Sequence, residues 1–213
     1  MSTYTPEQKR LTKSWIVCGV ATGILGDLAY TGAVAPLPIP HGLRMLLGFA
    51  FGPLISLAFI GNYHFLKLYR NSVALQAGTV FAVIAGTLVN LMLVVQSAIF
   101  LTIPREARAD LGLAFDGLNM VQLGMDVSWD IYFSSAMILL GIAMLGHPRF
   151  GRIWGAASIL IGSGLLVLNL ASFPVPPGEA ESIDLGPLSG LFYLLASIRI
   201  WTSLKWVDER LEE

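Results

Sequence analysis

The stretch from Val73 to Thr102, VALQAGTVFAVIAGTLVNLMLVVQSAIFLT, contains no charged residue and few polar ones. A helix needs about 20 predominantly apolar residues to cross the hydrocarbon core of a bilayer. This stretch is longer than that minimum, so it predicts a membrane-spanning helix. Five further stretches of the chain are also long and predominantly apolar, and short polar segments separate them.

Together, the six stretches predict an all-α polytopic membrane protein, a bundle of six transmembrane helices that forms a single domain over residues 1–213. The chain is 55% hydrophobic and 13% charged, about half the charged fraction of a typical soluble domain. Its mean hydropathy is +0.70. The expected spans are residues 14–33, 43–66, 73–102, 122–146, 151–172 and 186–206. Pro- and Gly-rich or charged segments, such as 104–117 and 173–187, are expected to form loops.

The first apolar stretch has some features of a secretory signal peptide, because Lys9, Arg10 and Lys13 precede it. However, Asp27 interrupts the stretch and Pro36 follows it directly. The stretch is also longer than the apolar core of a usual signal peptide. We therefore expect it to remain as the first membrane span.

The distribution of Lys and Arg predicts the orientation, because cytoplasmic loops of membrane proteins carry an excess of these residues. One side of the expected bundle carries Lys9, Arg10, Lys13, Lys67, Arg70, Arg149, Arg152, Lys205 and Arg210. The other side carries only Arg44, Arg105 and Arg108. This asymmetry predicts that both termini lie in the cytoplasm.

The net charge and the spacing of small residues indicate which kinds of partner to expect. The net charge of −1 gives no indication of nucleic acid as a partner. The expected partner is the lipid bilayer itself. Small residues recur at four-residue spacing, for example at Gly19 and Gly23 and at Gly151 and Gly155. Such stripes let helices approach closely, either inside the bundle or between copies in a homo-oligomer or a larger membrane complex.

The fourth expected span carries a polar face. Asn119, Gln122, Asp126 and Asp130 are spaced by three or four residues, so they share one side of a helix. Asp126 and Asp130 lie one turn apart, and their charges would repel each other if both were ionised in a dry site. Such a pair suits a proton acceptor or a site that binds a cation.

Other spans place polar groups at a similar depth, and ionisable groups at that depth normally face the bundle interior or water. We therefore expect an outward-opening polar pocket. Its expected ligand-binding residues are Asp27, Asn90, Asp126, Asp130 and Asn169. The alternative is structural: Asp126 would lie in the headgroup layer and Asp27 would hydrogen-bond to a neighbouring helix.

We expect no catalytic residue, no cofactor and no metal. The chain has no Gly-rich phosphate loop and no His or Cys pair with metal spacing. His41, His64 and His147 lie at expected helix ends, which argues against paired haem ligation. The single cysteine, Cys18, excludes an intrachain disulfide.

Four segments of the C-terminal half resemble uncharacterised bacterial six-helix membrane proteins, known only as domains of unknown function. They are Gln122–Asp130 (QLGMDVSWD), His147–Arg152 (HPRFGR), Phe173–Pro177 (FPVPP) and Asp184–Pro187 (DLGP). The resemblance implies a multi-pass protein of the bacterial cytoplasmic (inner) membrane. It implies no activity and no functional residue.

Three functions are compatible with these features. The first is a small protein that binds or transports a small ligand or cation at an outward-facing acidic site. The second is an accessory or scaffold subunit of a larger membrane complex. The third is a membrane-embedded enzyme, for which the sequence offers three carboxylates but no nearby nucleophile–base pair.

Overall fold

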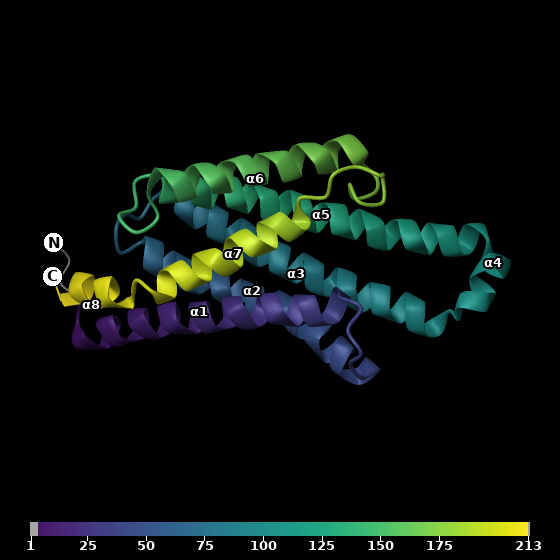
Figure 1. Ribbon diagram of the computed structural model, residues 1–213, viewed down its shortest axis with the longest axis horizontal. Helices are drawn as coiled ribbons and strands as arrows, with labels where there is room; N and C mark the ends of the chain where they lie inside the picture. The colour runs from purple at the N-terminus through teal and green to yellow at the C-terminus, as the bar shows by residue number, and fades with distance from the viewer. Residues whose placement is uncertain (1–3, 213) are drawn as a thin grey trace.

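The computed structural model describes residues 4–212, and every regular element in this part of the chain is helical (Figure 1). This confirms the predicted all-α class. The five long helices are α1 (Pro6–Val34), α2 (His41–Leu66), α3 (Val73–Thr102), α5 (Leu113–Met144) and α6 (Gly151–Ser172). Each of them is long and apolar enough to cross a membrane. These helices are those of a multi-pass membrane protein.

The last expected span, residues 186–206, is not one continuous helix. The structure divides it into α7 (Gly186–Trp201) and α8 (Leu204–Glu212). At the break, the hydroxyls of Thr202 and Ser203 both donate to the carbonyl oxygen of Arg199, at 3.0 and 2.8 Å. Side-chain bonds of this kind compete with the helical backbone pattern. With its 16 residues, α7 is about 24 Å long, shorter than the five long helices.

Two expected boundaries also differ from the structure. α1 begins at Pro6, because Thr5 and Gln8 form a reciprocal capping box at its start. α5 begins at Leu113 and not at residue 122, so part of the expected 104–117 loop is helical. The rest of that loop contains the short helices η1 (Arg105–Ala107) and α4 (Arg108–Leu111). Gly112 reverses the chain before α5 with φ +48°, a conformation that favours glycine.

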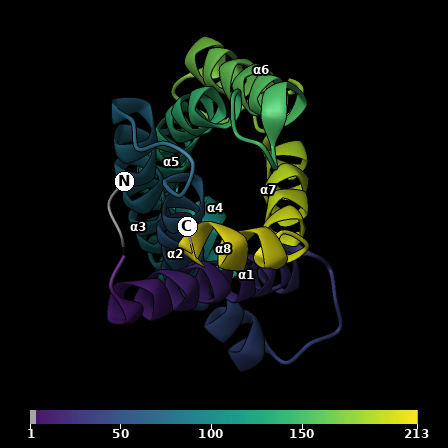
Figure 2. The same cartoon turned by 90° about the vertical axis from the view of Figure 1, so that its left-hand side faces the viewer.

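The helices form a ring when the bundle is viewed from one end (Figure 2). Consecutive long helices pack against each other, and α7 packs mainly against α1. α7 thus lies between α6 and α1 and closes the ring (Figure 2). Both termini lie at the same end of the bundle, while the tip between α3 and α5 projects from the other end (Figure 1).

Glycines allow the helix backbones to approach closely at three interfaces. A Cβ atom added at Gly19 would fall 2.5 Å from Cα of Gly61, at the α1–α2 contact. At the α2–α3 contact, a Cβ atom on Gly52 would clash with the carbonyl oxygen of Gly86. Gly141 and Gly155 form the equivalent contact between α5 and α6. Gly19, Gly52 and Gly155 therefore serve packing inside the chain, whereas nothing lies within 4 Å of a Cβ position at Gly151.

An aromatic cluster holds the α5–α6 turn at the end of the bundle that carries the termini. The ring of His147 is 1% exposed and lies 5.0 Å from the ring of Phe65 and 5.1 Å from that of Trp206. Its Nδ1 accepts a hydrogen bond from the backbone N–H of Arg149. Burial, together with the charge of Arg149, lowers the pKa of His147 from 6.5 to about 4.

Gly61→Ala should destabilise the protein, because the added methyl group meets the backbone of α1 at Gly19. We expect a loss of about 1–3 kcal/mol, the usual result of overpacking a tight core. Gly124→Ala is the matched control, since nothing lies within 4 Å of its Cβ position. Thermal unfolding in detergent should show a lower midpoint for Gly61→Ala alone. Equal midpoints for the two variants would contradict the close α1–α2 contact.

The low pKa of His147 makes the folded state prefer the neutral imidazole. Above pH 6.5 the imidazole is neutral in both the folded and the unfolded state. Between pH 6.5 and about 4 only the unfolded state binds the proton, so the free energy of unfolding falls as the pH falls through this range. The full effect is up to about 3 kcal/mol. His147→Gln should lose less stability than the wild type between pH 7 and pH 4.5, as measured by thermal unfolding. The exposed His41, changed to Gln, is the control and should follow the wild type; a wild-type slope in His147→Gln would refute this assignment.

Candidate functional site

One face of α5 supplies both carboxylates and aromatic rings to a single cavity. Asp126, Trp129, Asp130 and Phe133 follow the i, i+3, i+4, i+7 spacing of a helix face. All four line a cavity of about 230 Å³. Asp130 and Phe133 are buried, whereas Asp126 and Trp129 are half-buried nearer the opening.

Three other helices complete the wall of this cavity, and one of them, α2, contributes Phe51 and Ile55. Asp27 and Tyr30 come from adjacent turns of α1, and Ser189, Gly190 and Tyr193 come from the first turns of α7. Gly190 leaves room beside the Asp27 carboxylate, because a Cβ atom at Gly190 would lie 3.9 Å from Oδ1 of Asp27. The cavity is therefore built where α1, α2, α5 and α7 converge.

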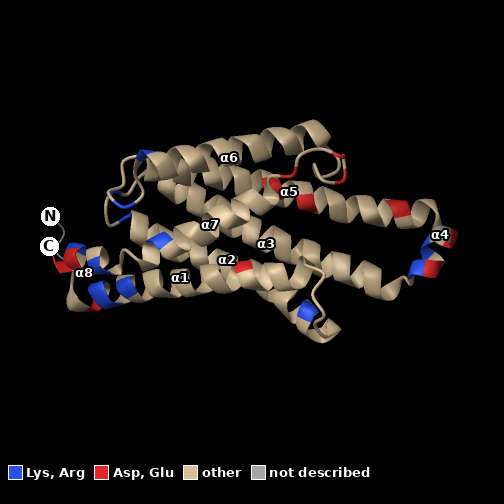
Figure 3. Cartoon of the chain, viewed as in Figure 1, with Lys and Arg blue, Asp and Glu red and all other residues tan. Residues whose placement is uncertain are grey.

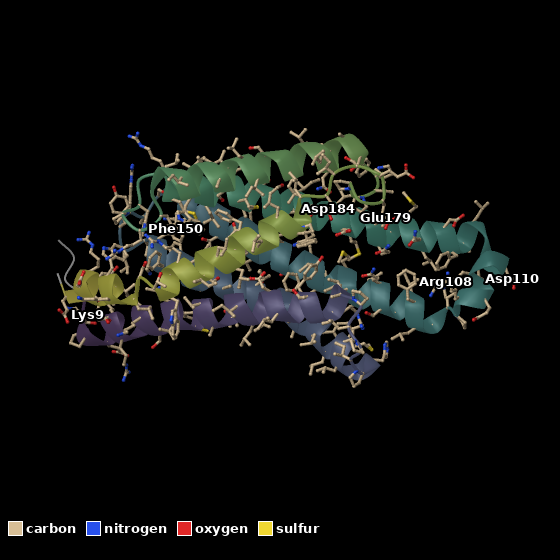
Figure 4. The ribbon with its side chains drawn as sticks, in the orientation of Figure 1. Lys9, Arg108, Asp110, Phe150, Glu179 and Asp184 are labelled. Atoms are coloured by element: carbon tan, nitrogen blue, oxygen red, sulfur yellow. The ribbon has the colours of Figure 1, made fainter. Side chains whose placement is uncertain are left out.

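The loop between α6 and α7 contributes two more carboxylates. Glu179 and Asp184 line the cavity together with Pro176 and Gly178, and Figure 4 shows the two acids in the same loop beside α5. Asp184 also holds the start of α7, because its Oδ1 accepts a 2.7 Å hydrogen bond from the backbone N–H of Gly186. The loop thus adds negative charge to the cavity and fixes the helix that forms its wall.

The charge of the cavity has one sign. Five carboxylates line it, and among the described residues in its lining there is no Lys or Arg. Figure 3 shows most basic residues at the end with the termini, whereas the acids of α5 and the α6–α7 loop lie in the other half. A cleft lined by charge of one sign concentrates ions of the opposite sign. The arrangement therefore favours a cation.

One carboxylate is held rigidly by a buried amide. Nδ2 of Asn169, which is fully buried, donates a 2.9 Å hydrogen bond to Oδ2 of Asp130 and a 3.0 Å bond to the carbonyl oxygen of Leu165. Asp27 differs, because its buried Oδ2 has no hydrogen-bond partner among the described residues. The cavity therefore contains one fixed carboxylate and one with unused acceptor capacity.

Aromatic side chains separate the cavity from the end of the bundle with the termini. Phe133 and Tyr193 belong to its lining, and Phe59 packs against both of them, with ring centroids 6.1 and 4.8 Å apart. The rings of Phe133 and Tyr193 are themselves 5.4 Å apart. These three rings are called the aromatic layer below.

Of the expected pocket residues, Asp27, Asp126 and Asp130 line the cavity. Asn169 joins them through its hydrogen bond to Asp130. Asn90 is not in the lining: its Cβ packs at the α2–α3 contact, within 2.6 Å of where Gly52 would carry a Cβ. The Asn90 side of α3 therefore faces α2, and the prediction that Asn90 lines the pocket is not met by this cavity.

Several lining residues were not expected from the sequence. They are Tyr30, Phe51, Ile55, Phe133, Glu179, Asp184 and Tyr193. The place of Phe133 in the lining could have been predicted from helical spacing, because it continues the Asp126–Asp130 face by one turn. Glu179 and Asp184 are conspicuous as loop acids, but nothing in their spacing shows that the loop folds over this helix face.

The carboxylates are spread around the cavity rather than gathered at one point. Among the described residues, no three His, Cys, Asp or Glu side chains lie close enough together to hold a metal ion.

No protein-family model, curated protein or solved structure matches this chain. The resemblance to uncharacterised bacterial membrane families stays a prediction.

The pair of Asn169 and Asp130 gives a test of this geometry. Asp130→Asn keeps an acceptor oxygen for the Asn169 amide, so its free energy of unfolding should stay within about 1 kcal/mol of wild type. Asn169→Leu leaves the buried Asp130 without its partner and should cost about 1–3 kcal/mol. Thermal unfolding of both variants in detergent provides the comparison. Equal stability of the two variants would show that the hydrogen bond does not hold Asp130.

Proposed function

We propose that this chain is a small integral membrane protein that binds a cation in the acidic cavity, as a binding or transport protein. The observation that carries the proposal is the convergence of acids from three separate segments. Asp27 of α1, Asp126 and Asp130 of α5, and Glu179 and Asp184 of the α6–α7 loop line one space. Ionised carboxylates brought together in a partly dry site repel one another, and a bound cation relieves that repulsion.

The proposed topology has six crossings with both termini in the cytoplasm. Both termini lie at one end of the bundle (Figure 1), which supports an even number of passes. In this proposal α7 is the sixth crossing in spite of its length. Its large exposed side chains, Leu188, Leu191, Leu195 and Ile198, recur at helical spacing, which is typical of a lipid-facing stripe. Lys and Arg gather at the end with the termini (Figure 3), as expected of a cytoplasmic face.

In this topology the cavity opens toward the outside of the cell. The proposed location is the bacterial cytoplasmic membrane, where the cavity faces the periplasmic or external side. The aromatic layer lies between the cavity and the cytoplasmic end. The structure thus supports an outward-open, inward-closed state, and transport through the chain requires the aromatic layer to part.

The two other expected functions have less support. The subunit hypothesis drew on the glycine stripes, but Gly19, Gly52 and Gly155 are used for packing inside the chain. The enzyme hypothesis needs a nucleophile with its base. In the described lining there is no His or Cys, and the Ser189 hydroxyl donates to the carbonyl oxygen of Gly186 at 2.6 Å. A homo-oligomer stays a prediction.

The double variant Asp126→Asn with Asp130→Asn tests the proposed function. Native mass spectrometry of the protein extracted from its own membranes should show a bound cationic species, absent from the variant. Calorimetric titration with a panel of Na⁺, Mg²⁺, Ca²⁺ and choline should identify at least one ligand whose affinity falls about 30-fold or more in the variant, as for a buried charge that loses its partner.

Asp110→Asn with Asp116→Asn is the matched control, because it removes the same charge from exposed positions outside the cavity. Figure 4 places Asp110 at the tip between α3 and α5, away from Glu179 and Asp184. This control should bind as the wild type does. If no cation binds the wild type, or if both double variants lose binding equally, the acidic cavity is not a cation site.

A further inference from the structure

The acidic cavity has a second property that its charge does not explain. Five of its lining residues are aromatic: Tyr30, Phe51, Trp129, Phe133 and Tyr193. They come from α1, α2, α5 and α7, so four separate helices each bring a ring to the same small space. A site for a hydrated inorganic ion gains nothing from such walls, since its ligands are oxygen atoms.

The rings form a continuous wall with faces in different directions. Tyr30 and Phe51 have centroids 4.8 Å apart. Phe51 and Trp129 stand nearly perpendicular, at 85° and 6.4 Å, and the wall continues from Trp129 to Phe133 at 5.8 Å. Ring faces attract organic cations, and Trp attracts them most strongly. Proteins recognise quaternary ammonium groups with aromatic cages, in which several rings surround the cation.

One buried polar atom in the lining is left for a ligand. Oδ2 of Asp27 is buried and has no hydrogen-bond partner within the described part of the chain. Buried polar atoms are rarely left unpaired, so this atom points to a bound group that supplies a polar or charged contact at this place.

We propose that the ligand is a small organic ammonium compound, whose cationic head lies between the carboxylates of Asp27, Asp126 and Asp130 and the rings of Tyr30, Phe51 and Trp129. This inference rests on the proposed cation site and names its ligand class. The volume of about 230 Å³ lies just below the range of roughly 300–1,000 Å³ found for drug-sized ligands. It therefore suits a head group with a short substituent.

The geometry of the acids separates this class from metal ions. Among the described residues no three acidic, His or Cys side chains are gathered as metal ligands, and Ca²⁺ takes six to eight oxygen ligands. An alkylated ammonium has a diffuse charge and needs no such shell.

The test compares choline with 3,3-dimethylbutan-1-ol, its neutral carbon analogue, by calorimetric titration of the full chain. Choline should bind and the neutral analogue should not. Trp129→Leu should weaken choline binding by a factor of roughly 5 to 30, the effect of losing one cation–π contact. Trp129→Phe should retain most of the affinity. Trp201→Leu is the matched control, because Trp201 is exposed and outside the cavity.

Each other outcome has a definite meaning. Binding of Na⁺ or Mg²⁺ but not choline, sensitive to the Asp126 and Asp130 double variant, would overturn the ammonium class and leave the proposed function intact. Equal binding of choline and its neutral analogue would also overturn it. Binding of no cation would overturn both proposals. Should Trp129→Leu fail to fold, the comparison of the two probes on the wild type still decides.

The source of the ammonium group is tested in nanodiscs. Choline affinity should be the same in discs of phosphatidylcholine and of phosphatidylglycerol if the ligand is a free compound. Competition in phosphatidylcholine discs alone would support the same ammonium chemistry with a lipid headgroup as its source. No choline binding in either disc type would overturn the proposal.

Discussion

Close backbone contact between neighbouring helices is the constraint on which the rest of this structure depends. Lipid tails are as apolar as the helix surfaces, so helices in a bilayer associate through packing and hydrogen bonds rather than through burial from water. Gly19 against Gly61 and Gly141 against Gly155 supply that packing. Because these contacts fix how each helix is rotated, they decide which side chains face the interior and which face lipid.

The close packing of α7 is confined to one neighbour. α7 packs tightly on α1, where a Cβ at Gly23 would meet the Ser197 hydroxyl, but only lightly on α6. Asp27, Asp126 and Asp130 gather in the space among α1, α2, α5 and α7. Carboxylates are costly in contact with lipid, and this interior space accommodates them.

The residues that share one face of a helix could be predicted from the sequence. Which faces of different helices meet in the bundle could not. The shared face of Asp126 and Asp130 follows from their spacing, and Asp27 was expected from its depth in the first span. Asn90 has a similar depth, but the glycine contact of α2 with α3 turns it away from the cavity. The fold of residues 173–185 over that face depends on long-range packing, so Glu179 and Asp184 could not be placed from the sequence. The break after Trp201 depends on local hydroxyl bonds that hydropathy does not register.

The aromatic layer has an electrical consequence. Moving one elementary charge across a whole membrane changes its energy by about 2.3 kcal/mol per 100 mV, and that energy is distributed along the insulating part of the path. Phe59, Phe133 and Tyr193 pack against one another beside the cavity. In the proposed topology the greater share of the voltage drop would therefore fall between the cavity and the cytoplasmic end. Occupancy of the cavity would then respond weakly to membrane potential, and passage of the cation through the aromatic layer would carry most of the voltage dependence.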